Sequence, residues 1–514
     1  MKVLSIERWI VLLFSFFFFS INIWHHVHSG PPSWDEAWYL ETSFRLFYAL
    51  KESVWLFIRE YVHAFGDRPP LIAVLPIPIY FLLGAGEKVG LLVNDVGLLL
   101  AGWSVYQIGK RLYGEVAGLG AVVSLWLMPL VYGLSRVYLV ECWLMTLTCL
   151  TYWQLLEAKA KGRGYGIRLG LLLGLGMLVK PVFPLYVLGG AIVGWRVLVR
   201  EWLYVFGVGL LVAMSWYVFN FEGMFNHVMS ASRGSLSHYY GQSSSIISVS
   251  TLRDYEEIIR EGLSWRTVVG GGVLVLVSLM RGQFKSIRWS WKEWYWGLWF
   301  LIPFIICLFI YNRESRFLAA ALPPLAIGMG AVGAMILRKK KMGWFSGILF
   351  GLFFLLPLST YTTQTFGFPG GPPYKFNGPP AILGQWDRLA VLEAILQDSE
   401  GHPVSAITNF NYPTFNYNNL TSLAYQKRYP IHLYGFESMT KIEDVLNFIR
   451  SYQIQYVVLV KGSLPWNLNP IINGLRLPLQ EFFESDKAPV RKIGHVSLRP
   501  DVEASIYRIL DAKK

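Results

Sequence analysis

The chain has 514 residues, of which 54% are hydrophobic, 16% aromatic and 15% charged, and its formal net charge is +13. With a mean hydropathy of +0.40, this composition excludes a soluble globular protein and is typical of a polytopic membrane protein. The positive charge does not predict binding to nucleic acid, because Lys and Arg fall in short clusters between apolar runs and form no single basic patch.

Short basic clusters indicate how the chain crosses the membrane. Cytoplasmic loops carry an excess of Lys and Arg, so we expect the clusters to face the cytoplasm and every other connection to face outward. The N-terminus then lies inside and the C-terminal domain outside, in a multi-pass protein of the plasma (inner) membrane. The clusters are Lys2 and Arg8, Lys110 and Arg111, Lys159 to Arg168, Arg196 and Arg200, Arg281 to Lys292, and Arg338 to Lys341.

Apolar segments between these clusters predict the transmembrane helices. A hydrocarbon core of about 30 Å needs about 20 apolar residues per helix, and the chain offers about eleven such segments before residue 361. The first has no small-residue cleavage pattern, so we interpret it as a retained signal anchor. Residues 69–85 contain four prolines, which break helix hydrogen bonding, and we expect this stretch to be re-entrant or to lie along the surface. The predicted spans are about 9–27, 90–109, 116–135, 141–158, 167–180, 182–198, 202–220, 266–280, 294–311, 317–337 and 343–360.

The predicted outward loops gather acids and bases in one layer. Asp35 and Glu36 follow the first span within residues 34–39 (WDEAWY), and an amphipathic stretch up to residue 61 has the composition of a helix in the interface plane. Ionisable groups beside membrane spans tend to mark substrate or ion pathways. Carboxylates act as general bases or hold a divalent cation, and Arg and Lys bind phosphate oxygens, so the layer suits a lipid phosphate. Its other members are Arg68, Arg136, Glu141, Lys180, Arg313 and Arg316.

Each of these residues also has a purely structural interpretation. Asp35 and Glu36 can form an ordinary polar loop or helix start, and the arginines can anchor the chain at the lipid headgroups. Glu141 can simply pair with Arg136, and Lys180 can mark a helix end. Histidines at positions 25, 26 and 28 lack a clear fourth ligand, so a metal site there is not favoured. The three cysteines lie within apolar spans, which argues against a structural disulfide.

Six motifs follow the first helix in a fixed order. They are residues 34–39 (WDEAWY), 68–71 (RPPL), 109–114 (GKRLYG), 135–141 (SRVYLVE), 174–181 (GLGMLVKP) and 316–324 (RFLAAALPP). This order resembles the GT-C superfamily of integral-membrane glycosyltransferases, in particular the branch with protein O-mannosyltransferases and the lipid A aminoarabinose transferase. The resemblance covers roughly residues 1–340, and it supports the reading of the chain as a membrane protein of many helices.

The resemblance implies an inverting transferase that moves a hexose or pentose from a polyprenyl-phosphate carrier to a lipid, glycan or protein acceptor at the outer face. Asp35 matches the family's catalytic acid/base aspartate, and Glu141 stands where members often have a second Asp. Arg68 replaces a Lys or His before Pro-Pro, and it would face the lipid phosphate together with Lys180 and Arg316.

Three further residues join the predicted site with less defined roles. Glu36 is a second candidate catalytic carboxylate beside Asp35, and Arg136 and Arg313 are candidate substrate-binding cations. Whether a divalent metal ion, held by Asp35 and Glu141, takes part is left open because family members differ. No other cofactor is implied.

The long apolar runs end near residue 361, and the sequence of the C-terminal residues predicts a soluble α/β domain. We predict a transmembrane catalytic domain over residues 1–360 with an outer loop at 28–85, a Gly/Pro-rich linker at 361–384 and an extracytoplasmic domain at 385–514. Helical periodicity marks residues 386–397, and a capping box at residues 440–443 opens a helix that ends near residue 451. Residues 403–408, 455–460 and 505–510 are expected to be strands. The triplet at Asn419 fits a glycosylation sequon, although such triplets are common by chance.

Two other functions compete with glycosyl transfer. A transporter or flippase of polyprenyl-linked lipids would place ionisable residues at the bilayer midplane, often in broken helices with repeat symmetry. Most predicted spans have uncharged centres, and the sequence shows no repeat. A scaffold whose outer domain binds a ligand gives no reason for acids and bases to converge beside the bilayer, so we favour the transferase.

Overall fold

The computed structural model describes residues 6–161, 164–233, 249–280, 291–309, 314–338, 343–368, 386–436, 439, 441–462, 473–485 and 488–510. The chain separates into two compact units. The first comprises Met1–Val27, Ile58–Leu75 and Leu91–Pro380, and the second comprises His28–Phe57, Pro76–Gly90 and Ala381–Lys514. The second unit therefore combines C-terminal residues with two earlier segments, of which residues 28–57 and 76–85 belong to the predicted outer loop.

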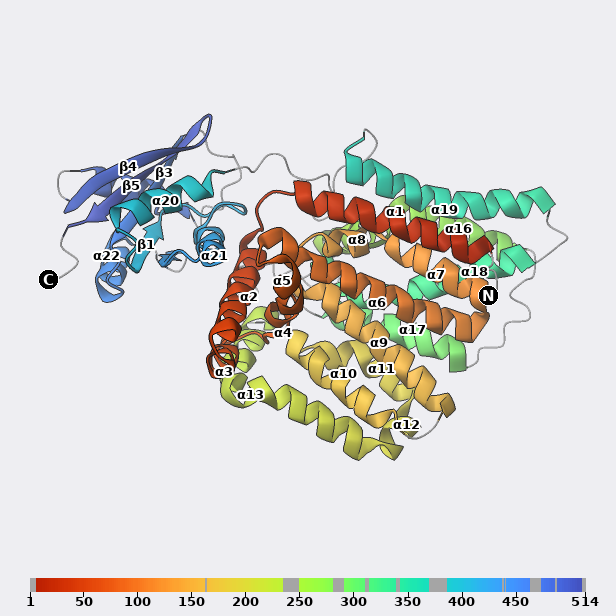
Figure 1. Ribbon diagram of the computed structural model, residues 1–514. Helices are drawn as coiled ribbons and strands as arrows, with labels where there is room; N and C mark the ends of the chain where they lie inside the picture. Colours follow the sequence, from red (N-terminus) through yellow and green to blue (C-terminus); the bar gives the residue numbers. More distant parts are fainter. Residues whose placement is uncertain are drawn as a thin grey trace. The chain divides into compact units, whose positions relative to one another are not determined.

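Helices build the first unit (Figure 1). Most of them run through long apolar sequence, as the composition predicts. In chain order they are α1 (Ile6–His28), the end of α3 (Val54–Val62), α4 (Leu71–Val74), α6 (Glu87–Tyr113), α7 (Glu115–Trp126), α8 (Pro129–Ser135), α9 (Val140–Lys161), α10 (Gly166–Val179), α11 (Phe183–Val193), α12 (Trp195–Arg200), α13 (Trp202–Arg233), α15 (Val249–Leu263), α16 (Trp265–Met280), α17 (Trp291–Leu308), the 3₁₀ helix η2 (Ser315–Ala321), α18 (Pro323–Arg338) and α19 (Gly343–Phe366).

Each predicted span coincides with one of these helices or with two consecutive ones. Within the described residues, α1, α6 and α13 are long and apolar enough to cross a membrane, and two bent pairs, α7 with α8 and η2 with α18, raise the number of candidates to five. Helices α10 and α11 have 14 and 11 residues, fewer than the roughly 20 that one crossing needs. The apolar helices support an integral membrane protein, while the number and direction of crossings stay predictions.

Prolines interrupt residues 69–85 as predicted. Two short helices, α4 and α5 (Ile77–Leu83), take the place of one long helix, and each begins directly after a proline, Pro70 and Pro76. Helix α5 ends at Gly84, whose φ of +84° lies in the region that favours glycine. This stretch therefore does not form one continuous membrane-crossing helix.

Glycines allow close helix packing in the first unit. A Cβ atom on Gly170 would lie 2.7 Å from the carbonyl oxygen of Tyr204, and one on Gly174 would lie 2.8 Å from that of Gly209. In membrane proteins, small residues at a helix–helix interface let the two backbones approach this closely. The glycines of α10 thus set its distance from α13.

A five-stranded mixed sheet forms the centre of the second unit, with strand order β2-β1-β3-β5-β4 (Figure 1). Strand β1 pairs in parallel with β2 and β3, whereas β5 pairs antiparallel with β3 and β4. The strands predicted at 403–408, 455–460 and 505–510 are present as β1, β3 and β5. The bounds are β1 (Val404–Thr408), β2 (Ile431–Tyr434), β3 (Tyr456–Gly462), β4 (Val490–Arg499) and β5 (Val502–Ile509).

Hydrophobic residues lie on both faces of this sheet. Along β3, Val458 and Val460 belong to the core that contains α20 and α21, whereas Val457 and Leu459 belong to the core that contains α22 and α24. Successive strand residues point to opposite faces, so a buried strand is apolar throughout. The helices are α20 (Arg388–Asp398), α21 (Tyr417–Lys427), α22 (Ile442–Ser451) and α24 (Arg476–Glu484). Helix α22 confirms the predicted helix, although its N-cap is Lys441, and the predicted cap, Thr440, lies outside the described residues.

Helix α2 (Trp34–Glu52) packs against α21 within the second unit. The Tyr48 hydroxyl donates to the carbonyl oxygen of Gln426 at 3.1 Å, and the Asn419 amide donates to the carbonyl oxygen of Pro32. Asn419 is fully buried, so the sequon at this position is not accessible in the fold. Two nitrogen atoms of Arg388 contact the two carboxylate oxygens of Glu87 at 2.9 Å each, which gives a buried, two-pronged ion pair.

Breaking this ion pair should destabilise the second unit. Arg388→Met leaves the Glu87 carboxylate buried without its cation, and we expect the free energy of unfolding to fall by about 3–5 kcal/mol. Pulse proteolysis of the purified full chain in urea measures this loss. Arg491→Met is the matched control, because the Arg491 ion pair with Asp398 is solvent-exposed and pairs of that kind contribute at most about 1 kcal/mol. Equal losses in the two variants would contradict the structural role of Arg388.

Glu41 is a buried acid on α2, and burial raises its pKa to about 7 against the opposing charge of Arg45. Below pH 4.5 Glu41 is protonated in both the folded and the unfolded chain, so its ionisation does not affect the free energy of unfolding. Between pH 4.5 and 7 the unfolded chain loses this proton more readily than the folded chain, and the free energy of unfolding falls. Relative to Glu41→Gln, the wild-type chain should lose about 3 kcal/mol over that window.

Thermal unfolding at pH 5 and pH 8 measures the effect of Glu41. We expect Glu41→Gln to be more stable than wild type at pH 8 and closer to it at pH 5, whereas Glu443→Gln, on an exposed position of α22, should match wild type at both. A stability difference between Glu41→Gln and wild type that is the same at both pH values would show that Glu41 ionises normally.

Candidate functional site

Glu141 lies at the start of α9 in the first unit and is 1% exposed. The chain before it is held in place, because the Asn94 amide donates to the carbonyl oxygen of Val137 at 2.7 Å and the Tyr138 hydroxyl donates to that of Ile72. The Lys180 ammonium group contacts Oε1 of Glu141 at 2.9 Å. The alternative that Glu141 simply pairs with Arg136 is therefore wrong.

Lys180 reaches Glu141 from the end of α10. Pro181 disfavours helical backbone at the residue before it, and Lys180 is accordingly an extended C-cap with φ −155°. Its ammonium group lies 4.4 Å from the ring centroid of Phe317, whose carbonyl oxygen accepts from the Tyr186 hydroxyl at 2.6 Å. The Lys-Pro pair thus ends the helix and turns the lysine toward the start of η2.

Arg316 completes the group, which we name the Glu141–Lys180–Arg316 cluster. Its Nε lies 3.9 Å from Oε1 of Glu141, its guanidinium group lies 5.4 Å from the Phe317 ring, and it forms an ion pair with Glu314. The side chains of Lys180 and Arg316 are 21% and 18% exposed, against 2% for Glu141. The two cations can therefore contact a ligand, while the buried carboxylate holds them in place.

One oxygen of Glu141 is not used by the cluster. Among the residues that the structure describes, Oε2 of Glu141 has no hydrogen-bond partner, although it is buried. Buried carboxylate oxygens normally accept hydrogen bonds. The cluster can thus bind anionic oxygens through Lys180 and Arg316, and Oε2 of Glu141 keeps the capacity to accept a hydrogen bond.

Arg136 belongs to a different polar network. Its Nε donates to Oδ1 of Asn22 at 3.0 Å, one terminal nitrogen donates to the Thr365 hydroxyl at 3.1 Å, and its guanidinium lies 4.9 and 5.3 Å from the ring centroids of Tyr132 and Tyr361. The side chain is 2% exposed, and it lies between α1, α8 and α19. Its predicted contact with substrate stays a prediction.

The same network contains two residues that the sequence analysis did not select, Asn22 and Asp95. The Asn22 amide donates to Asp95 at 2.6 Å and to the Ser135 hydroxyl at 2.9 Å, and Nε2 of His26 lies 3.0 Å from the Asp95 carboxylate. No local pattern marks these residues, because their partners lie between 69 and 114 positions away. His26 is therefore part of a polar network that joins α1, α6 and α8.

Helix α13 fixes the loop that carries Arg68. The Trp216 indole donates to the carbonyl oxygen of Ala64 at 3.1 Å, and Nδ1 of His227 lies 3.1 Å from the Asp67 carboxylate. A Cβ atom on Gly223 would lie 2.7 Å from the carbonyl oxygen of Gly66, so the loop sits directly against the helix. Arg68 is half-buried and is followed by the buried Pro69 and Pro70. His227 and Trp216 were not predicted for this role.

Asp35 and Glu36 lie in the first turn of α2, in the second unit. The Glu36 carboxylate accepts from the backbone N–H of Ser33 at 3.1 Å and from its hydroxyl at 2.6 Å, which is the capping-box arrangement. Glu36 is 8% exposed, whereas Asp35 is half-buried. The Ser-x-x-Glu spacing at residues 33–36 is a sequence signal for the cap. Arg313 lies outside the described residues.

Comparisons with known proteins indicate which fold the chain has. The family model for dolichyl-phosphate-mannose-protein mannosyltransferases matches residues 67–219. The crystal structure of ArnT from Cupriavidus metallidurans bound to undecaprenyl phosphate is similar, with a TM-score of 0.59, 12% identity and coverage of 99% of both chains. The chain has the GT-C glycosyltransferase fold. This fold agrees with the resemblance that the order of motifs indicates.

Two more solved structures share the GT-C fold with this chain. The oligosaccharyltransferase AglB from Archaeoglobus fulgidus, in complex with an inhibitory peptide and a dolichol-phosphate, has a TM-score of 0.53 at 12% identity over 88% of this chain and 69% of its own. The arabinofuranosyltransferase AftD from Mycobacteria has a TM-score of 0.58 at 14% identity over 99% of this chain and 40% of its own. No curated protein sequence matches the chain.

The family match covers only some of the candidate site residues. Residues 67–219 contain Arg68, Glu141 and Lys180 but neither Asp35 nor Arg316. In the described ranges, no three His, Cys, Asp or Glu side chains come close enough together to bind a metal ion. We therefore derive no step through a metal ion.

The stability of the cluster can be tested by removing its lysine. Lys180→Met leaves Glu141 with Arg316 at 3.9 Å as its nearest cation, so we expect the free energy of unfolding to fall by about 1–3 kcal/mol. The double variant Lys180→Met/Glu141→Gln should recover part of this loss, because the buried charge is gone. Thermal unfolding of the purified chain measures both. A double variant that is less stable by the sum of the single effects would contradict direct pairing.

Proposed function

We propose that the protein is an inverting glycosyltransferase that moves a sugar from a polyprenyl-phosphate carrier to an acceptor at the outer face of the membrane. The observation that carries this proposal is the Glu141–Lys180–Arg316 cluster, in which two partly exposed cations surround a buried carboxylate within the GT-C fold. The similar solved structures support the donor class, since ArnT was solved bound to undecaprenyl phosphate and AglB in complex with a dolichol-phosphate.

The cluster is assigned to the donor phosphate. Lys180 and Arg316 stabilise the negative charge that grows on the lipid phosphate as the bond from its oxygen to the anomeric carbon breaks. Arg can hold two phosphate oxygens through its fork, and Lys adds a point charge. Arg68, on the loop held by α13, is proposed as a third cation for the same phosphate.

Asp35 is proposed as the general base. The acceptor hydroxyl or amine attacks the anomeric carbon, its proton passes to the Asp35 carboxylate, and the lipid phosphate leaves with the bonding electron pair. Attack opposite the leaving group inverts the anomeric centre. A positioned base of this kind contributes roughly 10²–10⁴-fold to the rate.

Glu141 and Glu36 act indirectly in this proposal. Glu141 positions Lys180 and Arg316, and its second oxygen is available to orient the sugar or acceptor. Glu36 caps the helix that carries Asp35 and so fixes the backbone of the base. The N-terminus is proposed to be cytoplasmic and the second unit extracytoplasmic, as the basic clusters predict.

The role of Asp35 is tested by Asp35→Asn, which should abolish transfer in a folded protein because the amide cannot accept the proton. Release of polyprenyl phosphate from synthetic polyprenyl-phosphate-mannose or polyprenyl-phosphate-arabinose measures the reaction, and circular dichroism reports folding. Asp444→Asn, on an exposed position of α22, is the control and should keep wild-type activity. Full activity in folded Asp35→Asn would remove Asp35 as the base.

The donor site is tested by Lys180→Ala and Arg316→Ala. Loss of one cation from a phosphate site should raise the donor KM or lower kcat by about tenfold or more, with a smaller effect on the acceptor KM. Arg450→Ala, also exposed on α22, should leave both constants unchanged. Unaltered donor kinetics in both cluster variants would show that the cluster does not contact the donor.

A further inference from the structure

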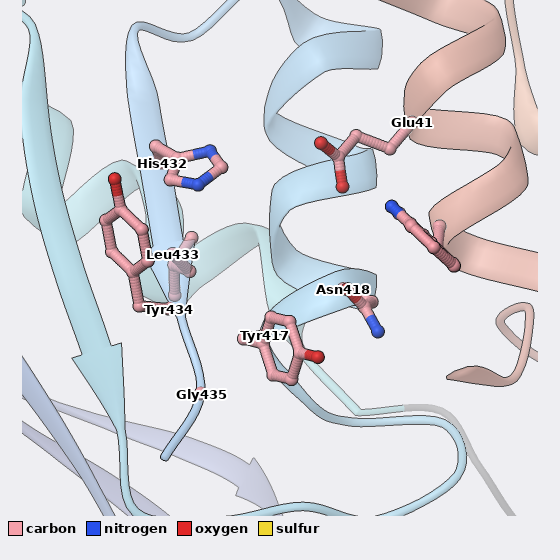
Figure 2. A pocket seen from close by; sticks show the side chains of 8 residues that line it. Glu41, Tyr417, Asn418, His432, Leu433, Tyr434 and Gly435 are labelled. Atoms are coloured by element: carbon pink, nitrogen blue, oxygen red, sulfur yellow. The ribbon is translucent and has the colours of Figure 1, made fainter. Parts of the chain in front are cut away.

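A cavity of about 410 Å³ lies within the second unit, between helices α2 and α21 and strand β2. Figure 2 shows the Glu41 carboxyl group directed from α2 toward α21, with Tyr417 and Asn418 at the start of α21 and His432 on the strand. Its size falls within the range of ligand pockets, about 300–1,000 Å³. Neither the donor site nor the proposed base accounts for this cavity.

The walls of the cavity are fixed by specific contacts. The Thr421 hydroxyl exchanges hydrogen bonds with the backbone N–H and carbonyl groups of Leu433 at 3.2 and 3.3 Å, which ties α21 to β2. Gly435 leaves room for the Tyr417 ring, because a Cβ atom at position 435 would lie 2.5 Å from it. Asn416 caps α21 by accepting from the backbone N–H of Asn419 at 3.1 Å. The cavity is therefore a built feature of the unit.

Its lining combines aromatic faces with hydrogen-bonding groups. Six of the eight lining residues carry a polar side-chain group: Trp38, Glu41, Tyr417, Asn418, His432 and Tyr434. His432 and Tyr434 alternate with Leu433 along β2 and so share one face, with ring centroids 4.5 Å apart. This mixture of flat rings with donors and acceptors suits a molecule that has both hydroxyl groups and apolar C–H faces.

The charges of the cavity do not favour an ionic ligand. Glu41 faces Arg45, one turn farther along α2, and Arg45 opposes the pKa rise that burial causes at Glu41. Burial and the same Arg45 lower the pKa of His432, so the imidazole is neutral at neutral pH. The ionisable side chains among the polar lining residues are Glu41, whose pKa burial raises to about 7, and His432, which is neutral, so the lining offers no fixed charge to an ionic ligand. The polar lining also disfavours an acyl chain.

The cavity lies one helical turn from the proposed base. Asp35 and Trp38 are three residues apart on α2, so they share a helix face and are separated by about 4.5 Å along the axis. Glu41 lies three residues farther along α2 and neighbours Trp38 on the helix surface. A molecule in contact with Trp38 would thus lie within about one helical turn of Asp35, the residue that takes the proton of the acceptor in our proposal.

We propose that the cavity formed by α2, α21 and β2 is a subsite for a neutral sugar residue of the acceptor, which makes the acceptor a glycan or glycolipid. This inference rests on the proposed function, because it takes Asp35 as the base. Trp38 and Tyr417 offer faces to the sugar ring, and Glu41, Asn418 and His432 bind its hydroxyl groups.

Binding of neutral glycans to the full chain tests this subsite. The probe is an array of neutral hexose and pentose oligosaccharides, with phosphorylated and sialylated sugars beside them, and the protein is held in nanodiscs because maltoside detergents carry sugar headgroups. We expect binding to neutral glycans only. Trp38→Leu and Asn418→Ala should each weaken it at least tenfold, whereas Asn447→Ala, on exposed α22, should change it less than twofold.

Circular dichroism of each variant separates lost binding from lost folding. If one of the two variants does not fold, the other still tests the subsite. Absence of binding to neutral glycans, preference for charged sugars, or unchanged binding in folded Trp38→Leu and Asn418→Ala would each overturn the subsite. Release of polyprenyl phosphate from the donor, measured on the same wild-type sample, distinguishes the two proposals. Donor turnover without glycan binding contradicts the subsite alone, whereas glycan binding without donor turnover contradicts the transferase.

Discussion

The buried carboxylate of Glu141 is the constraint around which the candidate site is arranged. Removing this charge from water is costly unless cations compensate it, and Lys180 and Arg316 do so from α10 and η2. Three elements that are far apart in the sequence are thereby brought to one point. Two cations held in advance by one carboxylate match what a departing phosphate needs, because they need little rearrangement when charge develops.

Much of the helical part could be predicted from composition and basic clusters, since a hydrocarbon environment demands long apolar helices. The sequence did not show that α13 continues to Arg233, because its last turns leave the apolar pattern. Strand β4 was missed for a similar reason: Arg491, Lys492 and His495 interrupt its alternation on an edge strand, where charged residues are tolerated. Strand β2 has only four residues.

The candidate site shows what motifs convey and what they leave out. The motifs selected Glu141, Lys180 and Arg316, and the structure joins these three directly. They also selected Arg136, which contacts Asn22 and Thr365 instead, and no spacing in the sequence predicts those distant partners. Glu36 was readable as a helix cap from Ser33, three residues before it. Residue type indicated the chemistry, whereas tertiary contacts separated structural charges from available ones.

Retention of polyprenyl phosphate by the cluster is the central claim, and native mass spectrometry of the purified chain with undecaprenyl phosphate measures it most directly. Wild-type protein should retain the lipid, and the double variant Lys180→Ala/Arg316→Ala should lose it while remaining folded. Equal retention by wild type and the folded double variant would contradict the account.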